Sequence, residues 1–193
     1  MPDLKLVLGG DGAVGKTCLM ITRATGKFPS ESVPTVFEEP EDYVTAVAQA
    51  DGSLVTLQLW DRAGRLDVER LRPLFYPDTH VHVVCFSLVG HSSFDSVRST
   101  WIPELEHHSP GVPVVLVGTK LDLRLDGPML ARLKSNRDVP ITFEQGARAA
   151  RELGCVAYRE CAATVFIVLD HLSHFSAVYH PTPVTRAVGM RST

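Results

Sequence analysis

The sequence predicts an α/β fold in which a mostly parallel, six-stranded sheet has helices on both faces. Strand-like and helix-like segments alternate along the chain, which is typical of parallel sheets built from strand–helix–strand units. The strand-like segments 81–88 and 112–118 are apolar throughout, as strands covered on both faces are. The chain has 193 residues, 45% of them hydrophobic, which suffices for one domain with a buried core.

In the N-terminal half, LKLVL (4–8) leads through a glycine-rich turn into GKTCLMITRATG (15–26), a helix that ends at a glycine. LVTLQLW (54–60) alternates apolar and polar residues and is expected to be a half-buried strand. An Asp-Gly pair at 51–52, a strong hairpin signal, connects it to YVTAVAQ (43–49). We therefore expect these two segments to form a hairpin.

A helix is expected between the two wholly apolar strands. An apolar stripe at helical spacing marks it, and Pro103 is expected to kink it. The stripe consists of Phe94, Val97, Trp101 and Leu105.

The C-terminal part contains a further helix, a short strand and a last helix. Thr142 and Gln145 have the spacing of a capping box at the start of the helix over 142–154. The strand is expected at 156–162, and an apolar face at helical spacing predicts the last helix at 164–179. We expect one domain over residues 1–180, followed by a flexible tail at 181–193.

Composition excludes several classes of protein. The formal net charge of −3 gives no basic field for nucleic acid. The four cysteines form no CxxC pair and are expected to be reduced thiols of a cytosolic protein. No apolar stretch reaches the roughly 20 residues of a membrane helix, and the N-terminus begins as a strand rather than as a signal peptide. His171 and His174 have helical spacing but no evident third ligand, so surface or structural roles are favoured over a metal site.

The loop after the first strand carries a complete G-x-x-x-x-G-K-T motif over residues 10–17. Glycines let backbone N–H groups converge on phosphate oxygens, and the following helix turns its positive end toward the anion. Lys16 would supply a charge to the β- and γ-phosphates, and the Thr17 hydroxyl can bind Mg²⁺. A chance glycine turn is the alternative, but the position between a strand and a helix favours phosphate binding.

Three further residues are candidates for the metal and the terminal phosphate. Thr35 lies in a loop before the hairpin and would otherwise be an ordinary loop hydroxyl. Asp61 ends its strand and is placed to hold a metal-bound water, while the Gly64 N–H can reach a terminal phosphate. The alternative for Asp61 and Gly64 is an ordinary surface Asp-Gly turn. Without the phosphate motif at residues 10–17, that alternative would be preferred.

The segment VGTKLDL (117–123) ends an apolar strand with a pattern that can recognise a base. The Asp122 carboxylate can accept hydrogen bonds from N1–H and the 2-amino group of guanine, neither of which adenine presents. A site built around these hydrogen bonds can bind guanine in preference to adenine by ~10⁴-fold or more. Lys120 would lay its stem along the base and brace the phosphate loop with its amine. The pattern is weak alone, but its place one strand–helix unit before ECAA (160–163) favours guanine recognition.

These segments resemble the Rho family of small GTPases, most closely its Rac-like branch. The resemblance spans residues 3–180 and rests on GDGAVGKTCL, VPTVFE, LWDRAG, RLRPLFYPDT, CFSLV, VGTKLDLR and ECAA, in the order of the family. It implies a small G domain of the P-loop NTPase class that binds GTP or GDP with Mg²⁺. Residues 125–139 occupy the place of the short helical insert that marks this family.

The resemblance also implies individual roles. Thr17 and Thr35 would bind Mg²⁺ directly, and Asp61 would do so through a water. Residues 30–39 and 61–75 would be the two switch segments that bind effectors, exchange factors and GTPase-activating proteins. The nucleotide would be held by Gly12, Ala13, Val14, Gly15, Lys16, Thr17, Cys18, Phe28, Thr35, Asp61, Gly64, Thr119, Lys120, Asp122, Ala162 and Ala163.

The second switch segment departs from the family pattern D-T-A-G-Q, because Arg62 and Arg65 stand in place of the threonine and the glutamine. The glutamine orients the attacking water, and an arginine has no acceptor for that purpose. We expect the catalytic set of Lys16, Thr35 and Gly64, with Arg65 in place of the glutamine, to keep GTP bound and to hydrolyse it slowly. Arg62 is expected to be a solvated surface residue.

Other departures affect exchange, partners and anchoring. Ser32 replaces a tyrosine that covers the phosphates, which predicts a looser lid and faster exchange. The acidic, longer segment around EEPED (38–42) means that effector choice does not carry over. The loop that follows E-C-S-A in the family is shortened before TVF (164–166), a sign of imperfect folding. The chain ends in GMRST without a C-a-a-X cysteine, so no prenyl anchor is expected.

The favoured function is a monomeric, cytoplasmic GTP/GDP molecular switch in signal transduction, of the kind that the family uses in signalling to the actin cytoskeleton. Its partners would be proteins rather than nucleic acid or a stable membrane anchor. Three alternatives stay open: an ordinary cycling GTPase, an interaction module or defective product without nucleotide, and a P-loop ATPase or kinase. The T-K-L-D segment argues against the last of these.

Overall fold

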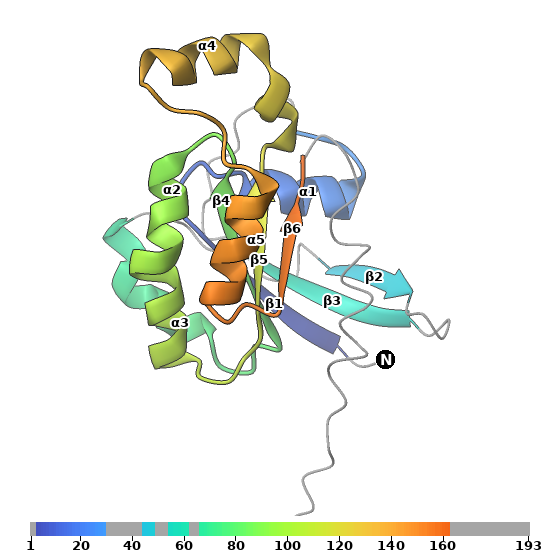
Figure 1. Cartoon of the computed structure of the whole chain (residues 1–193). Coiled ribbons are helices and arrows are strands. Elements are labelled where there is room, and N and C mark those ends of the chain that lie inside the picture. The colour runs from blue at the N-terminus through green and yellow to red at the C-terminus, as the bar shows by residue number, and fades with distance from the viewer. Residues whose placement is uncertain (1–2, 30–43, 49–53, 62–65, 163–193) are drawn as a thin grey trace, which may run out of the picture.

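Six strands form one sheet in the computed structural model, which describes residues 3–29, 44–48, 54–61 and 66–162 (Figure 1). The strands lie in the order β2-β3-β1-β4-β5-β6; β2 is antiparallel to β3 and the other pairs are parallel. The predicted fold class is therefore confirmed. The strands are β1 (Asp3–Gly9), β2 (Val44–Ala48), β3 (Leu54–Asp61), β4 (Val81–Ser87), β5 (Val114–Thr119) and β6 (Ala157–Glu160).

The burial of each strand follows its residue pattern. Every residue of β4 is buried, and β5 is buried from its second residue onward, as expected for wholly apolar strands inside a parallel sheet. In β3, Val55, Leu57 and Leu59 are buried, whereas Thr56 and Gln58 between them are half-buried. The alternation therefore identifies which face of β3 packs on the core.

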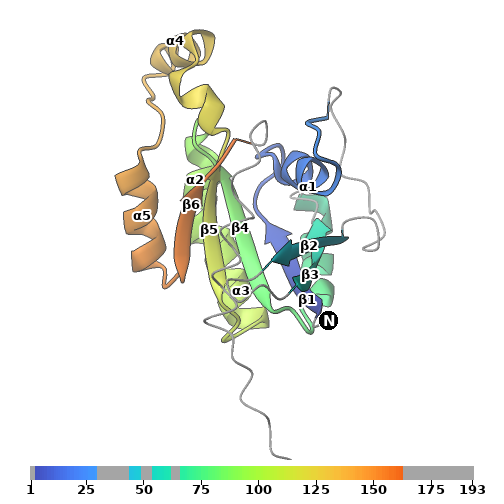
Figure 2. The ribbon, with the colours of Figure 1, turned by 90° about the vertical axis from the view of Figure 1, so that its right-hand side faces the viewer.

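Helices cover both faces of the sheet, and Figure 2 shows α1 and α5 on opposite sides of it. Leu6 and Leu8 of β1 pack in one core cluster with residues of α1, while Val7 packs in a second cluster with residues of η3, α3 and α5. The sheet therefore separates two apolar layers. The helices are α1 (Lys16–Thr25), η2 (Leu66–Phe75), α2 (His91–Ser96), η3 (Val97–Trp101), α3 (Ile102–His108), η4 (Leu121–Leu125), α4 (Gly127–Ser135) and α5 (Phe143–Glu152).

The predicted helix boundaries are confirmed for α1 and α5. Gly26 adopts a left-handed conformation (φ 74°) after α1, and its N–H donates to the carbonyl oxygen of Thr22. At the start of α5, the Thr142 side chain accepts from the Gln145 N–H while the Gln145 side chain accepts from the Thr142 N–H. This reciprocal pair satisfies donors at the helix start, as a capping box does.

The helix between β4 and β5 is irregular directly before Pro103, where a kink is expected. The irregularity lies before the proline: η3 is a π-helical turn in which the Ile102 N–H donates to the carbonyl oxygen of Val97. Pro103 itself lies in the first turn of α3. The π-helical hydrogen bonding therefore lies directly before a residue that has no N–H to donate.

Several predictions fall on other parts of the chain. The turn at 51–52, the helix at 164–179 and the tail at 181–193 lie outside the described residues and stay predictions. The expected insert at 125–139 contains α4, which stands away from the sheet at the top of Figures 1 and 2. Among the described helices, none has the length and apolar character that crossing a bilayer requires.

Candidate functional site

Both predicted binding motifs lie at the carboxyl ends of parallel strands, where open α/β sheets bind ligands. The phosphate motif at 10–17 joins β1 to α1, and the segment 119–122 begins at the end of β5. Asp61 ends β3 and is in register with Leu8 of β1, so its backbone lies at the same edge. The fold therefore brings these three segments to one edge of the sheet.

The phosphate loop requires glycine where it leaves the sheet. Gly10 has a φ of +131°, and a Cβ at this residue would lie 2.1 Å from the carbonyl oxygen of Cys85 in β4. No side chain fits there, because the loop passes directly over the neighbouring strand. Gly15, with a φ of +103°, is the N-cap of α1 and has open space where a side chain would stand.

The start of α1 suits a phosphate group. The N-cap Gly15 supplies no side-chain acceptor, and the first turn contains no acidic residue. No acidic side chain of the first turn therefore competes with an anion for the positive end of the helix. The open space beside Gly15 lets a phosphate approach the backbone closely. The loop therefore fits the phosphates of a nucleotide.

Lys16 is buried, with 4% of its surface exposed, although its side chain is charged. Its Nζ donates to the carbonyl oxygens of Gly10 and Asp11, each at 2.8 Å. The loop backbone thereby holds the ammonium group within the loop, where it can contact a bound phosphate. Thr17, the next residue of α1, is also buried, at the position predicted for a Mg²⁺ ligand.

Thr119 joins the phosphate loop to the end of β5. Its buried hydroxyl lies 2.6 Å from the carbonyl oxygen of Val14 and 2.8 Å from that of Phe86, so one proton is shared between two acceptors. Val14 belongs to the phosphate loop and Phe86 to β4. The predicted base-recognition residue Thr119 is thus a structural link that fixes the phosphate loop relative to the segment after β5.

Lys120 and Asp122 lie in the turn that follows β5. Lys120 has a left-handed backbone (φ 61°) where η4 begins, and its side chain is half-buried. This burial lowers the pKa of the Lys120 amine, while the Asp122 carboxylate acts in the opposite direction. Asp122 is exposed, so its carboxylate is accessible to a ligand.

The end of β6 pairs with this turn, as the order of the motifs predicts. The Leu121 N–H donates to the carbonyl oxygen of Cys161 at 2.9 Å, and the Cys161 N–H donates to that of Gly118 at 2.8 Å. Burial, with the charges of Asp122 and Glu160, raises the pKa of the Cys161 thiol to about 12. Cys161 is therefore a neutral, structural thiol, and Ala162 beside it is buried.

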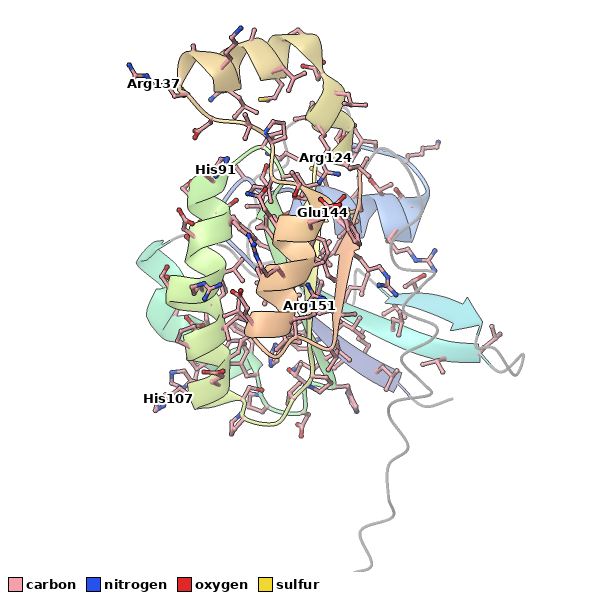
Figure 3. The ribbon with its side chains drawn as sticks, in the orientation of Figure 1. His91, His107, Arg124, Arg137, Glu144 and Arg151 are labelled. Atoms are coloured by element: carbon pink, nitrogen blue, oxygen red, sulfur yellow. The ribbon has the colours of Figure 1, made fainter. Side chains whose placement is uncertain are left out.

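An ion pair between Arg124 and Glu160 connects η4 to β6. The Arg124 nitrogens Nη1 and Nη2 lie 2.6 and 2.5 Å from the two carboxylate oxygens of Glu160. Nη2 also donates to the carbonyl oxygen of Ile141, and the Tyr158 hydroxyl donates to Glu160 at 2.7 Å. The hydrogen bond to Glu160 raises the pKa of Arg124. Arg124, labelled in Figure 3 near the start of α5, thereby positions the turn that carries Asp122.

Several predicted site roles stay predictions. Phe28 is described and half-exposed beyond the end of α1, so its role beside a base stays a prediction. Within the described ranges, no three His, Cys, Asp or Glu side chains are grouped to hold a metal ion, which leaves the predicted hydroxyl ligands of Mg²⁺ untested. Thr35, Gly64, Arg65, Ala163 and the Asp61 side chain lie outside what the structure describes.

Sequence reasoning missed the residues that hold the motifs in place. Asp11 is a variable position of the phosphate motif, and Trp101 was expected only as part of an apolar stripe. The structure joins them by a hydrogen bond of 2.8 Å from the indole Nε1 to the Asp11 carboxylate. Arg124 and Glu160 stood inside matched segments without an expected role. No local signal identifies these contacts, because each spans a long stretch of sequence.

One comparison with known proteins bears on this site. A family model described as the Ras family matches residues 5–175, which include the phosphate motif, both strands of the expected hairpin and the segments around Asp122 and Cys161.

Proposed function

The chain belongs to the Ras family, and from this premise we propose that it is a Rho-type GTP-binding switch whose GTP hydrolysis is weakened. Proteins of the Ras family are small GTPases that bind GTP or GDP, typically with Mg²⁺, and that interact with effectors, exchange factors and GTPase-activating proteins. The Rho-type character, the slow hydrolysis and a cytoplasmic role in cytoskeletal signalling are the proposal.

The observation that supports nucleotide binding best is the hydrogen bond from Thr119 to the carbonyl oxygen of Val14. It fixes two motifs, one suited to phosphate and one suited to guanine, at a constant separation on one edge of the sheet. Lys16 and the N-terminus of α1 would bind the phosphates, and Thr17 would bind Mg²⁺. Mg²⁺ would neutralise phosphate charge when bound.

Guanine selectivity follows from the accessible carboxylate of Asp122. Inosine nucleotides lack the 2-amino group, so they lose one of the hydrogen bonds that Asp122 can accept from guanine. We expect the wild type to bind GTP at least about ten-fold more tightly than ITP. In D122A this preference should disappear, because the acceptor is gone. Asp95 of α2 is also an exposed aspartate, and D95A is the matched control that should keep the preference. A D122A protein that still prefers GTP over ITP would disprove the role of Asp122.

Weakened hydrolysis rests on Arg65, which replaces the water-orienting glutamine of the family pattern. A guanidinium group has only donors, so it cannot accept a hydrogen bond from the attacking water. Single-turnover cleavage of bound GTP, measured with and without an activating protein, should be slow in the wild type. Restoring the acceptor in R65Q should raise the rate at least about ten-fold. R62Q is the control and should leave the rate unchanged. Equal rates in wild type and R65Q would favour an ordinary cycling GTPase.

The Rho-type assignment is supported by residues 125–139, where α4 occupies the place of the helical insert that marks the Rho family.

Partner binding is supported by η2, which lies inside the second expected switch segment and exposes Leu71 and Leu74 to solvent. Exposed leucines of this kind give a partner protein apolar surface to cover. The cytoplasmic location is supported by four free cysteines, as in reducing compartments. Capture of Rho-type effector domains by the GTP-loaded protein, but not by the GDP-loaded protein, tests the assignment.

A further inference from the structure

Trp101 contacts the phosphate loop and the last residue of β1 before it. Its indole Nε1 donates to the Asp11 carboxylate at 2.8 Å, and the backbone carbonyl of the same Asp11 accepts from Lys16. The six-membered part of the indole lies against Gly9, where a Cβ would be only 3.1 Å from Cε3. Trp101 is 2% exposed, whereas Asp11 is half-buried, so the hydrogen bond between them is partly shielded from solvent. Its side chain therefore supports the loop stem and the residue that holds Lys16.

The other side of Trp101 faces η2. The Arg72 guanidinium carbon lies 4.5 Å from the centre of the indole ring. Arg72 also forms a two-point ion pair with Glu104 of α3, at 3.2 Å from Nε and 2.7 Å from Nη2, and the Tyr76 hydroxyl donates to the same carboxylate. Arg72 is 3% exposed, and buried charge pairs with this geometry hold their partners firmly.

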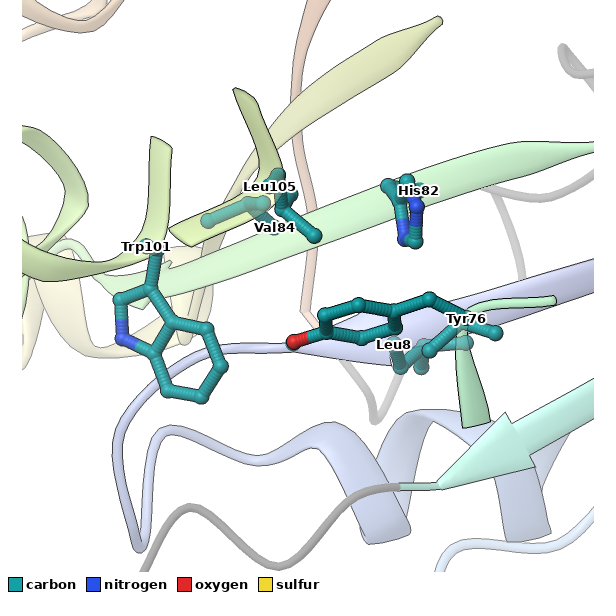
Figure 4. A pocket seen from close by; sticks show the side chains of 8 residues that line it. Leu8, Tyr76, His82, Val84, Trp101 and Leu105 are labelled. Carbon is teal, nitrogen blue, oxygen red and sulfur yellow. The ribbon is translucent and has the colours of Figure 1, made fainter. Parts of the chain in front are cut away.

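Packing around these residues is tight. Figure 4 shows Trp101 and Tyr76 facing one another beside Leu8 and His82. The void that these side chains line measures about 10 Å³, room for no more than one water molecule. The contact between η2 and Trp101 is made by Arg72 itself, so a displacement of η2 that moves Arg72 acts directly on the indole.

Trp101 lies at the end of a π-helical turn. The turn η3 ends at Trp101, and its wider hydrogen bonding runs from Ile102 N–H to the Val97 carbonyl oxygen. A π turn inserts an extra residue and re-aims the side chains that follow, and such turns occur frequently at functional sites. Trp101 is thereby presented between the phosphate loop and η2.

We propose that Trp101 is a positioning residue that couples η2 to the phosphate loop, so that a disturbance of either element loosens the other. The proposed function gives Trp101 no role, because Trp101 is not among the residues predicted to bind the nucleotide. The coupling assigns it one. It rests on the proposed function only where nucleotide release is the readout. Coupling of this kind is reciprocal, so it can be measured from both ends.

From the loop end, the readout is hydrogen exchange of the η2 amides, which needs no nucleotide. D11A removes the acceptor, whereas D11N keeps an oxygen at the same position and is the matched control. We expect D11A to speed exchange of η2 by about ten-fold or more and D11N by less than about three-fold. Unchanged η2 exchange in a folded D11A protein would overturn the proposal, even if the chain bound no nucleotide.

From the η2 end, the readout is release of labelled GDP. E104Q weakens the ion pair of Arg72 without touching the phosphate loop, and W101F keeps an aromatic ring but removes the indole N–H. Each is expected to speed release by about ten-fold, while the double variant should be no faster than about two-fold over W101F. Additive effects of E104Q and W101F would overturn the coupling.

A general loss of stability must be separated from coupling. Ile141 is buried in the same core cluster as Trp101 but does not line the void beside it, so I141A provides a control that loses packing elsewhere. I141A should leave GDP release within about two-fold of the wild type at a temperature where both are folded. If I141A speeds release as much as W101F does, Trp101 has no positioning role. If GDP does not bind to the wild type, the proposed function fails, and η2 exchange in D11A alone decides the coupling.

Discussion

Replacing Thr119 by valine tests the link between the phosphate loop and the turn that carries Asp122. Valine has nearly the shape of threonine but no donor, so the carbonyl groups of Val14 and Phe86, at 2.6 and 2.8 Å, lose their shared partner. Depriving a buried acceptor of its hydrogen bond costs about 1–3 kcal/mol. We expect T119V to lower the free energy of unfolding by about 2 kcal/mol and to weaken GDP binding by about ten- to thirty-fold.

The matched control for this variant is T119S, which keeps the hydroxyl and loses one methyl group. Its unfolding free energy should fall by about 1 kcal/mol, while GDP affinity stays within about three-fold of the wild type. Urea unfolding measures the first quantity, and a fluorescence titration with labelled GDP measures the second. The two variants thus separate loss of packing from loss of the link. Equal GDP affinities for T119V and T119S would refute the positioning role of the hydroxyl.

Two further predictions concern stability. Gly146 of α5 lies against Tyr158, and a Cβ at this residue would be 2.1 Å from the ring. G146A should therefore lower the free energy of unfolding by about 2–3 kcal/mol. A Cβ at Gly127 in α4 would have nothing within 4 Å, so the control G127A should change the free energy of unfolding by less than about 1 kcal/mol. Urea unfolding compares them, and equal stabilities would contradict the clash. Burial and the charge of Lys5 lower the pKa of His82 to about 4 from 6.5. Because the unfolded chain binds more protons between these values, stability should fall by up to about 3 kcal/mol as the pH drops through this window, and less steeply in H82F. Parallel pH profiles of the two proteins would show that His82 is not responsible.

The fold could be predicted from the sequence because its determinants are local. Continuous burial of β4, alternation in β3, and the capping box of Thr142 and Gln145 are each encoded within a few residues. The turn at η3 could not be predicted in this way. A proline at 103 indicates an irregularity nearby, but whether a kink or a π turn results depends on how the helix packs on β4 and η2.

The candidate site could be predicted where it is formed by contiguous motifs. Lys16 and Asp122 each stand within a short pattern whose spacing reflects a phosphate or a base. The contacts that position these motifs were not predictable, since Thr119 reaches Val14 across 105 residues and Trp101 reaches Asp11 across 90. Such contacts exist only once the sheet order is set, and they leave no periodic signal in the chain.

The most direct test of the account is to identify the nucleotide carried by the purified protein. The protein is denatured after purification with Mg²⁺, and the released small molecules are separated by chromatography; a second sample is first treated with a Mg²⁺ chelator. The account predicts GDP or GTP in nearly the same amount as protein, and much less after chelation. It is contradicted if the protein carries no guanine nucleotide and if neither GDP nor GTP, added with Mg²⁺, raises its melting temperature.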